Sequence, residues 1–408
     1  MSDSLKPSKN IRIEIDVREE FFRLIASLPW NLDFDKWEKN KVNKLNIKSG
    51  IARHRLIFVR IGKYKFAIKE MSRRVAKKEI QNYQKLFTLG IPTLEPVGVV
   101  TKFEEPIIEE SDFGINVFEN EIGFAITVLA EKVLPDSYLY KREFTDKNRL
   151  KILDAAVKLF VQLHSKGIYW GDASLANLLI HFGKEVVPNL GKRTVLKAIL
   201  ADAETIEFPI QISDSLRKMD LEHFFEYIDW FAEDLRASGI LKDIGEVEKE
   251  KSYILENYEM LIEIEEAEKD FEKITNLNVK KVIGDFKNVN YAEDLLKHIR
   301  EHKWYLNQKS EEEISLKEAA QDWLENIFLP ICDIFRNENL LEIFPHETAA
   351  DLYVEIMQHK YFLSEKAEKD IGFINAMKSY CNNFGEQQTS PKLLKILTNA
   401  IQSILGKK

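Results

Sequence analysis

Cysteine is scarce in this 408-residue chain, which contains only Cys332 and Cys381. So few cysteines in a chain of this length are typical of a reducing compartment, and we expect a cytoplasmic protein. No His/Cys cluster has the spacing of zinc ligands, which argues against a zinc site. No stretch approaches eighteen uninterrupted apolar residues, and the opening MSDSLKPSKN has no apolar centre, so neither a membrane span nor a secretory signal is expected.

A concentrated basic face is also missing. The formal net charge is -8, and Lys and Glu are interspersed along the chain. Because nucleic-acid phosphates are bound by clustered cations, this pattern argues against a nucleic-acid partner. The composition is 45% hydrophobic, so a chain of this length can bury a sizeable core and has room for two or three domains.

The most informative motif that is present places Asp172 five residues before Asn177 and is followed by the apolar residues Leu178 to Ile180. This is the spacing of the catalytic loop in kinase-like phosphotransferases. There the Asp accepts or orients the proton of the attacking hydroxyl, and the Asn oxygen reaches a Mg²⁺ that bridges the ATP phosphates. The spacing alone is common, so it needs support from other residues.

A second acid supplies part of that support. The apolar run from Val195 to Leu200 predicts the next strand of a hairpin, and it ends two residues before Asp202. We interpret Asp202 as the second metal ligand, beside Asn177.

Two residues of the N-terminal half occur in the expected order. Lys69 ends the alternating segment KYKFAIK, which predicts a strand with Phe66 and Ile68 on the face opposite to Lys69. Ten residues on, Glu79 lies in a predicted helix that ends near Gly90. Lys69 would hold the α and β phosphates and Glu79 would orient it. The alternative is an edge-strand lysine and a solvated helix carboxylate.

A glycine-rich loop is missing before Lys69. The candidate phosphate cover is KSGIARHRLIFVRIG, with Gly50, Arg53 and His54, in which a cationic side chain would replace some amide donors. Arg53 and His54 could equally be surface residues. Because of their place in the order of the chain, main-chain groups from Leu129 to Lys132 are expected to hold the edge of the adenine.

Several longer segments resemble one family. They are FFRLIASLPWNLDFDKW, SGIARHRLIFVRIG, GIPTLEPVGVVT, WGDASLANLLI, ADAET and HKYFLSEKAEKDIG. They are similar to the bacterial family called domain of unknown function 4032, often described as lipopolysaccharide-kinase-like. The resemblance implies a protein-kinase-like fold and the roles given above for Lys69, Glu79, Asp172, Asn177 and Asp202. It implies no substrate.

The predicted fold class is α+β, a two-lobed protein-kinase-like fold with an added C-terminal α-helical domain. We expect an N-terminal tail and helix at 1–39, an N-lobe at 40–135, a C-lobe with the catalytic loop at 136–240 and a helical domain at 241–408. Asp220 lies near the start of a predicted core helix. It would brace the catalytic loop or be an ordinary acid of the first helical turn.

The last part of the chain contains a duplication. HKWYLNQKSEEEISLKEAAQDW from His302 recurs as HKYFLSEKAEKDIGFINAMKSY from His359, which predicts a repeated helical hairpin at 302–323 and 359–380. We interpret its aromatic positions as core packing. The other interpretation makes His302 and His359 a symmetric pair that binds a ligand or partner.

The sequence therefore predicts a kinase that transfers the γ-phosphoryl group of ATP, with Mg²⁺, to a hydroxyl of a sugar, a lipid-linked glycan or a protein. A competing hypothesis is a pseudokinase, a nucleotide-gated interaction protein whose helical tail binds a protein partner. The absent glycine-rich loop favours the pseudokinase, and the set of Lys69, Glu79, Asp172, Asn177 and Asp202 favours the kinase.

Overall fold

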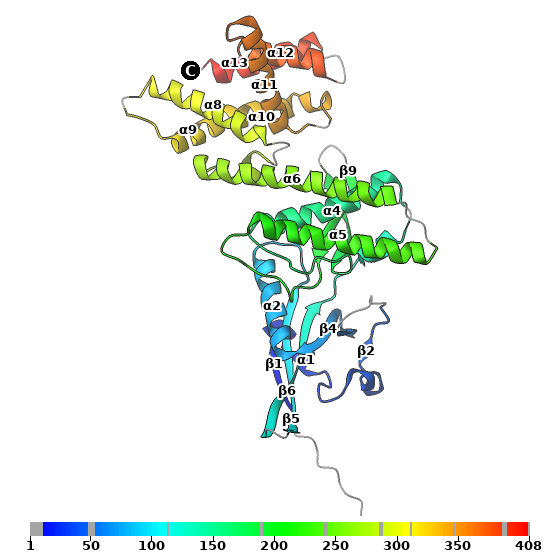
Figure 1. The fold of residues 1–408 in the computed structure, drawn as a ribbon. Coiled ribbons are helices and arrows are strands. Elements are labelled where there is room, and N and C mark those ends of the chain that lie inside the picture. The colour runs from blue at the N-terminus through cyan, green and yellow to red at the C-terminus, as the bar shows by residue number, and fades with distance from the viewer. Residues whose placement is uncertain are drawn as a thin grey trace, which may run out of the picture. The chain divides into compact units, whose positions relative to one another are not determined.

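The computed structural model describes residues 11–47, 54–111, 114–142, 144–187, 191–239, 244–284, 289–310, 312–345, 347–385 and 390–406. The chain forms two compact units, Met1–Tyr258 and Glu259–Lys408 (Figure 1). The boundary falls within the helix α6 (Ile244–Thr275). Each unit is described by itself.

The first unit begins with a six-stranded antiparallel sheet in the order β1-β5-β6-β4-β3-β2. Its strands are β1 (Arg12–Val17), β2 (Asn43–Lys44), β3 (Arg55–Ile61), β4 (Tyr64–Ser72), β5 (Pro96–Ser111) and β6 (Gly114–Val128). Strand β4 lies inside the sheet, paired with β3 on one side and β6 on the other. A side chain on β4 is therefore held by strands on both sides.

Side chains of β4 alternate between two covered faces. Phe66 and Ile68 are fully buried against a cluster that includes Trp37. This cluster includes residues of α1 (Glu19–Ala26), Phe34 of the short turn η1 (Phe34–Lys36), and Trp37, which lies between η1 and the short turn η2 (Glu38–Asn40). Lys69 points to the opposite face, as the alternation predicted. There it meets α2 (Arg73–Thr88), which packs against β4, β5 and β6 (Figure 1).

Helix α2 approaches the sheet closely at one glycine. A Cβ atom on Gly123 of β6 would lie 2.7 Å from Ala76 Cβ and 2.8 Å from Arg73 Cα. Only glycine leaves room for the helix at this distance from the strand. The close approach brings the buried face of α2, with Ile80 and Tyr83, onto the sheet.

The rest of the first unit is mainly helical. It has a three-stranded antiparallel sheet, β7-β8-β9, together with long helices. Its elements are β7 (Val133–Pro135), α3 (Asp136–Tyr140), α4 (Asp146–Ser165), β8 (Leu178–Val187), β9 (Gly191–Leu200), α5 (Asp214–Ala237) and the start of α6. In its core, Phe160 of α4 packs against Phe224 of α5 and against Trp170, with ring centroids 5.3 and 5.6 Å apart. The predicted α+β class is confirmed.

The second unit is entirely helical in its described residues. Besides the end of α6 it has α7 (Val279–Val282), α8 (Asn290–Asn307), α9 (Leu316–Trp323), the π-helical turn η3 (Leu324–Phe328), α10 (Leu329–Asn337), η4 (Leu340–Glu342), α11 (Ala349–Ala367), α12 (Phe373–Phe384) and α13 (Pro391–Leu405). One continuous apolar cluster runs through these helices, with Phe271, Leu295, Phe335 and Leu352 fully buried. The unit therefore has its own core.

The two copies of the predicted hairpin form side-chain hydrogen bonds at equivalent positions. His302 Nε2 lies 2.6 Å from Asp322 Oδ1, and His359 Nε2 lies 2.9 Å from Ser379 Oγ, at the same offset of positions. The turns match in the same way: Ile314 N donates to Asn307 Oδ1, and Ile371 N donates to Ser364 Oγ. Each histidine thus bonds within its own copy.

The interpretation of the repeated aromatic residues as core packing is wrong for three of them. Trp304, Tyr305 and Phe362 are 58%, 51% and 60% exposed, whereas Trp323 is 1% exposed. The buried stripe of α8 includes Leu295 and Ile299, and Trp304 and Tyr305 come five and six residues after Ile299. A helix turns about 100° per residue, so both positions lie off that stripe.

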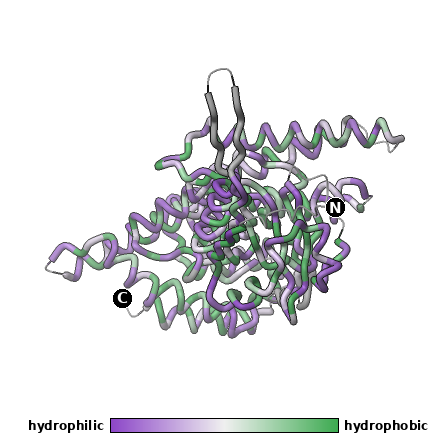
Figure 2. Tube along the Cα trace, turned by 90° about the horizontal axis from the view of Figure 1, so that it is seen from below, coloured by the Kyte–Doolittle hydropathy of each residue, from purple (hydrophilic) through white to green (hydrophobic). Residues whose placement is uncertain are grey.

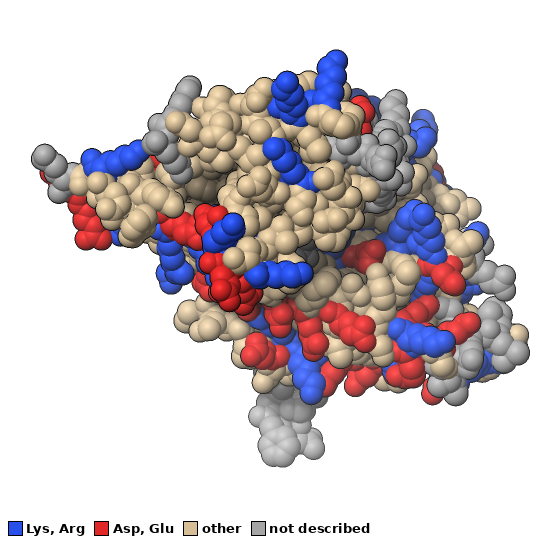
Figure 3. Space-filling model, turned by 90° about the horizontal axis from the view of Figure 1, so that it is seen from above, with Lys and Arg blue, Asp and Glu red and all other residues tan. Residues whose placement is uncertain are grey.

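Charged and apolar residues are mixed along the helices, as Figure 2 shows. Among the described residues, no helix is long and apolar enough to cross a membrane. On the face drawn in Figure 3, Lys and Arg side chains lie among Asp and Glu side chains, and the coloured residues there form no single basic patch.

Candidate active site

Asp172 and Asn177 lie in the loop between α4 and β8. Asn177 Nδ2 lies 3.3 Å from the Asp172 carbonyl oxygen and 3.5 Å from Asp172 Oδ2. The Asn177 carbonyl accepts a hydrogen bond from Ala201 N at 2.9 Å, which ties the loop to the residues that follow β9. The amide nitrogen of Asn177 faces Asp172, and the amide oxygen is the side-chain atom that could accept a metal ion.

Asp220 braces the start of this loop. It is fully buried on α5, and its two oxygens accept from the backbone N–H groups of Trp170, at 2.7 Å, and Gly171, at 2.8 Å. His164 Nε2 lies 3.0 Å from Asp220 Oδ2, and His164 Nδ1 lies 2.6 Å from the Tyr258 hydroxyl. Asp220 lies in the second turn of α5. The interpretation of Asp220 as a brace of the loop is therefore confirmed, and its interpretation as an ordinary acid of the first helical turn is wrong.

Gly171 has a backbone that favours glycine. Its φ is +82°, and an added Cβ would lie 3.2 Å from the Thr205 carbonyl oxygen. The Thr205 hydroxyl donates to the Trp170 carbonyl at 2.9 Å, so the segment after β9 lies directly against the loop. The left-handed conformation turns the chain just before Asp172.

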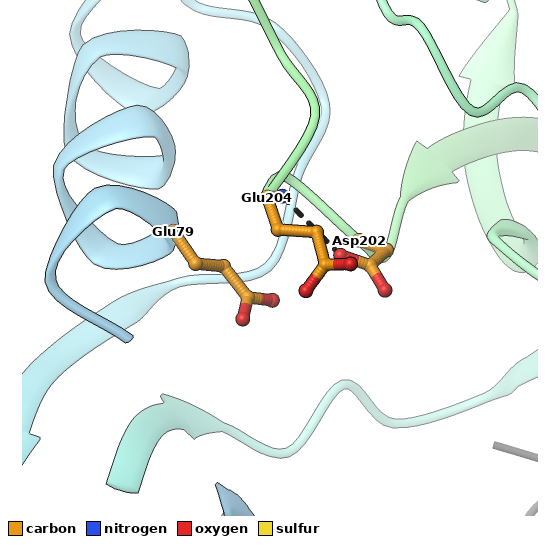
Figure 4. Close-up of side chains that lie close together, drawn as sticks. All are labelled: Glu79, Asp202 and Glu204. Atoms are coloured by element: carbon orange, nitrogen blue, oxygen red, sulfur yellow. Dashed lines mark hydrogen bonds between the residues drawn. The ribbon is translucent and has the colours of Figure 1, made fainter. Parts of the chain in front are cut away.

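Lys69 stands among three carboxylates. Its Nζ atom lies 2.8 Å from Asp202 Oδ2, 3.3 Å from Glu79 Oε1 and 3.7 Å from Glu204 Oε2. Figure 4 shows the three acids pointing toward one another, with Glu79 on α2 and the other two on the segment after β9. The predicted pairing of Lys69 with Glu79 is present, and Glu79 is 2% exposed, so it is not a solvated helix carboxylate.

The sequence reading missed Glu204, although it is two residues after Asp202. Its backbone N–H donates to Asp202 Oδ1 at 3.3 Å, and its carboxylate lies 3.2 Å from His54 Nε2. The D-x-E spacing was visible, but only the fold shows that the second acid turns back toward Lys69. His54 is thereby placed beside the cluster.

Burial and charge set the ionisation of this cluster. Burial raises the pKa of Glu79 to about 7, against the opposing effect of Lys69, and Asp202 adds to the rise. Burial by itself would lower the pKa of Lys69, but Glu79, Asp202 and Glu204 outweigh it and leave that pKa raised. Lys69 is therefore charged, and it does not fully offset the three acids.

Helix α2 is hydrogen-bonded to the segment that carries Asp202. Asn82 Nδ2 donates to the carbonyl oxygens of Ala203, at 2.7 Å, and Ile206, at 3.1 Å. The Tyr83 hydroxyl donates to the Ala201 carbonyl at 2.5 Å. These bonds hold Glu79 and Asp202 in one arrangement, and neither Asn82 nor Tyr83 was singled out from the sequence.

The remaining predicted residues fall in different places. Gly50 and Arg53 lie outside the described residues. Leu129 follows β6, and its N–H donates to the Lys65 carbonyl at 2.9 Å, so only its carbonyl is left to meet an adenine edge. Asp172 and Asn177 are linked to the Lys69 cluster through the backbone bond between Asn177 and Ala201.

The residues present suit a hard divalent cation. Carboxylate and amide oxygens are the ligands that Mg²⁺ prefers, and Asp202, Glu79, Glu204 and the Asn177 side chain supply them. Glu79 is buried, and its carboxylate accepts a hydrogen bond from Lys69.

These elements form a kinase-like fold. It has an antiparallel sheet with a Lys–Glu pair across β4 and α2, and a helical part that carries an Asp–Asn loop and a following acid. A family model described as "Domain of unknown function (DUF4032)" matches residues 319–384. This confirms the resemblance to that family. Of the similar segments, HKYFLSEKAEKDIG lies within the matched residues.

The solved structures that are similar to the chain include the following three. "WaaP in complex with acyl carrier protein" is 17% identical with a TM-score of 0.37, and the alignment covers 64% of this chain and 94% of that one. The Rio2 kinase–ADP/Mg²⁺–phosphoaspartate complex from Chaetomium thermophilum is 14% identical, with a TM-score of 0.31 and coverage of 55% and 74%. The Rio2 kinase from the same organism is 16% identical, with a TM-score of 0.31 and coverage of 55% and 76%. No curated protein sequence matches this chain.

Proposed function

We propose that this protein is an ATP-dependent phosphotransferase that moves the γ-phosphoryl group of Mg-ATP to a hydroxyl acceptor. The observation that carries the proposal is the position of Lys69 between Glu79 and Asp202, with the Asp172–Asn177 loop bonded to the same segment. In this reaction class the protein acts through positioning and charge. We place the reaction in the cytoplasm, because the chain has only two cysteines, both free.

Each residue then has a definite task. Lys69 binds the α and β phosphate oxygens, and Glu79 keeps its ammonium in place. Asn177 and Asp202 would hold Mg²⁺ through side-chain oxygens, and the ion would supply positive charge to the phosphates. His54 sits beside the cluster, where it would cover the phosphates together with Gly50 and Arg53.

Asp172 is the proposed general base. It receives the proton of the attacking hydroxyl, and its carboxylate is oriented by Asn177 and by the Tyr227 hydroxyl, which donates to Oδ1 at 3.2 Å. Asp220 and Gly171 fix the backbone that presents Asp172. The acceptor class, a sugar, a lipid-linked glycan or a protein, is not set by these residues.

Two substitutions separate chemistry from nucleotide binding. Asp172→Ala should lower kcat by at least about a hundredfold with ATP affinity nearly unchanged, because the base acts on the acceptor. Asp202→Asn should instead weaken Mg-ATP binding, measured by titration calorimetry. Asp214→Asn, an exposed acid on α5, is the control. Phosphotransfer is followed as an ATP-dependent mass gain in lysate or metabolite fractions, and full turnover by Asp172→Ala would contradict the proposal.

A nucleotide-gated interaction protein is the second candidate. One observation favours it: the Lys69 ammonium already pairs with Asp202 and Glu204, so it is engaged without phosphates. In this case the helical second unit would bind a protein partner. Labelled ATP with Mg²⁺ would then bind without any hydrolysis or autophosphorylation, while the kinase gives slow turnover that Asp202→Asn removes.

A further inference from the structure

Helix α2 lies on one face of the sheet (Figure 1), and the only charges on its opposite side are positive. Arg74, Lys78 and Lys85 are exposed there and Lys77 is half-buried, whereas the one acid of the helix, Glu79, is buried. A helix turns about 100° per residue, so the four cations fall within one arc of about 100°. They form a line about 16 Å long, which we call the basic stripe.

The cations of the basic stripe have no ion pair in the part of the chain that the structure describes. Arg73, the residue before Arg74, shows the contrast, because its guanidinium lies 2.9 Å from Glu121 Oε1 and 3.6 Å from Glu14 Oε2. Like charges four residues apart on a helix repel each other, and they remain unpaired here although the chain has a formal net charge of -8. Their positive charge is therefore available to an anionic partner.

An apolar loop continues this surface at the C-terminal end of the basic stripe. Lys85 Nζ lies 4.9 Å from the centre of the Phe208 ring. Asn82 Nδ2 donates to the Ile206 carbonyl at 3.1 Å, so the loop lies along α2. Ile210, two residues after Phe208, is fully exposed. A cationic helix face with exposed apolar side chains beside it is typical of proteins that bind the surface of an anionic bilayer.

Among anionic partners, charge and shape favour a bilayer. A helix is straight and convex, so cations along its outer side can touch a flat surface together. Each Lys or Arg near an anionic bilayer strengthens binding about fivefold. The exposed Ile210 adds an apolar contact, for which a bilayer offers acyl chains and a free phosphate ion or a nucleic-acid backbone offers nothing equivalent.

We propose that the basic stripe and Ile210 form a docking surface for a membrane with anionic lipid headgroups. The four cations meet the headgroups, and the Ile210 side chain enters the boundary between headgroups and acyl chains. The inference stands apart from the proposed phosphotransfer, because none of these side chains belongs to the cluster around Lys69.

The test is cosedimentation of the full chain with vesicles. The wild type should bind vesicles of phosphatidylglycerol and phosphatidylcholine in equal parts at least about tenfold more tightly than vesicles of phosphatidylcholine alone. The double variant Arg74→Gln, Lys78→Gln should lose at least about tenfold of that binding. The matched control is Lys147→Gln, Lys151→Gln, because these exposed lysines have the same spacing on α4, and it should bind nearly as the wild type does.

A third variant separates the apolar contact from the charges. Ile210→Ser should weaken the vesicle binding that remains at about 0.5 M NaCl, where the charge contribution is screened. Unchanged binding of this variant at high salt would remove Ile210 from the docking surface.

The remaining outcomes also decide. Thermal unfolding shows whether each variant is folded. The inference is overturned if the wild type leaves the phosphatidylglycerol vesicles unbound, or if the folded Arg74→Gln, Lys78→Gln variant binds them like the wild type. Displacement of the vesicles by excess inorganic phosphate would show a free-anion site instead, and tighter binding to single-stranded DNA would show a nucleic-acid surface. Vesicle binding without phosphotransfer would contradict only the phosphotransferase.

Discussion

Lys69 lies closer to Asp202 than to Glu79: its Nζ atom is 2.8 Å from Asp202 Oδ2 and 3.3 Å from Glu79 Oε1. Glu79 is the more deeply buried of the two acids, so the better-paired carboxylate is the one nearer to solvent. The buried acid is therefore incompletely compensated, and its ionisation should affect stability.

The first prediction concerns pH. Because the pKa of Glu79 is raised from 4.5 to about 7 in the folded chain, the folded state binds more protons than the unfolded state between these values. The proton on Glu79 stabilises the folded state fully when the pH is below the pKa that Glu79 has in the unfolded chain. This stabilisation is lost as the pH rises through 7, and the loss is about 3 kcal/mol at most. Unfolding at about pH 5 and about pH 8 should show a smaller loss for Glu79→Gln than for the wild type.

Glu222→Gln is the matched control for that experiment, because Glu222 is exposed on α5. It should keep the pH dependence of the wild type. Equal pH dependence in the wild type and Glu79→Gln would show that Glu79 titrates at an ordinary value.

The second prediction concerns the brace of the catalytic loop. Asp220→Ala should lower the free energy of unfolding by about 3 to 5 kcal/mol, because it leaves the buried N–H groups of Trp170 and Gly171 without acceptors. Chemical denaturation of the full chain measures the change. Asp214→Ala removes an acid of the same helix whose side chain is 99% exposed, and its effect should be small. A similar decrease in the free energy of unfolding for both variants would contradict the bracing role of Asp220.

The third prediction separates positioning from binding. Tyr227→Phe removes the hydroxyl that donates to Asp172 Oδ1, so kcat should fall about tenfold while KM for ATP stays the same. Tyr253→Phe removes a similar bond, from the Tyr253 hydroxyl to Asp154 at 2.6 Å, away from the loop. Steady-state kinetics of both variants should show the loss only at Tyr227. A raised KM for ATP would place Tyr227 at the nucleotide instead.

The fourth prediction compares two glycines with nearly the same backbone. Gly171 has φ +82° and Gly239 has φ +80°, but only Gly171 has neighbours within 4 Å of an added Cβ. Alanine at either position should cost about 1 kcal/mol or more of stability through its left-handed backbone. Only Gly171→Ala should also lower kcat, because its Cβ meets the Thr205 carbonyl. An unchanged kcat in Gly171→Ala would show that the loop tolerates the shift.

Local patterns were enough to predict several features. The alternation around Phe66 and Ile68 gave the face of Lys69, because side chains of a strand alternate whatever else surrounds it. The spacing of Asp172 and Asn177 and the strand before Asp202 gave the hairpin of β8 and β9. The repeat beginning at His302 gave matched turns, since similar local sequences make similar local bonds.

Other features depend on contacts between segments far apart in the chain. Tyr227 is 55 residues from Asp172, and His164 is 56 residues from Asp220, so no local pattern marks either as a partner. Glu204 reaches Lys69 only because α2 and the sheet bring them together. The exposure of Trp304 could not be predicted because an aromatic residue in a helix is as consistent with a core as with a surface.

The bonds from Asn82 and Tyr83 to the carbonyls after β9 make α2 and the Asp202 segment move as one piece. If α2 moved outward, either three main-chain oxygens would lose their donors or Asp202 would move together with Glu79. A regulator acting on this lobe could therefore not disengage Glu79 alone; it would have to dismantle the whole acidic cluster or leave it assembled.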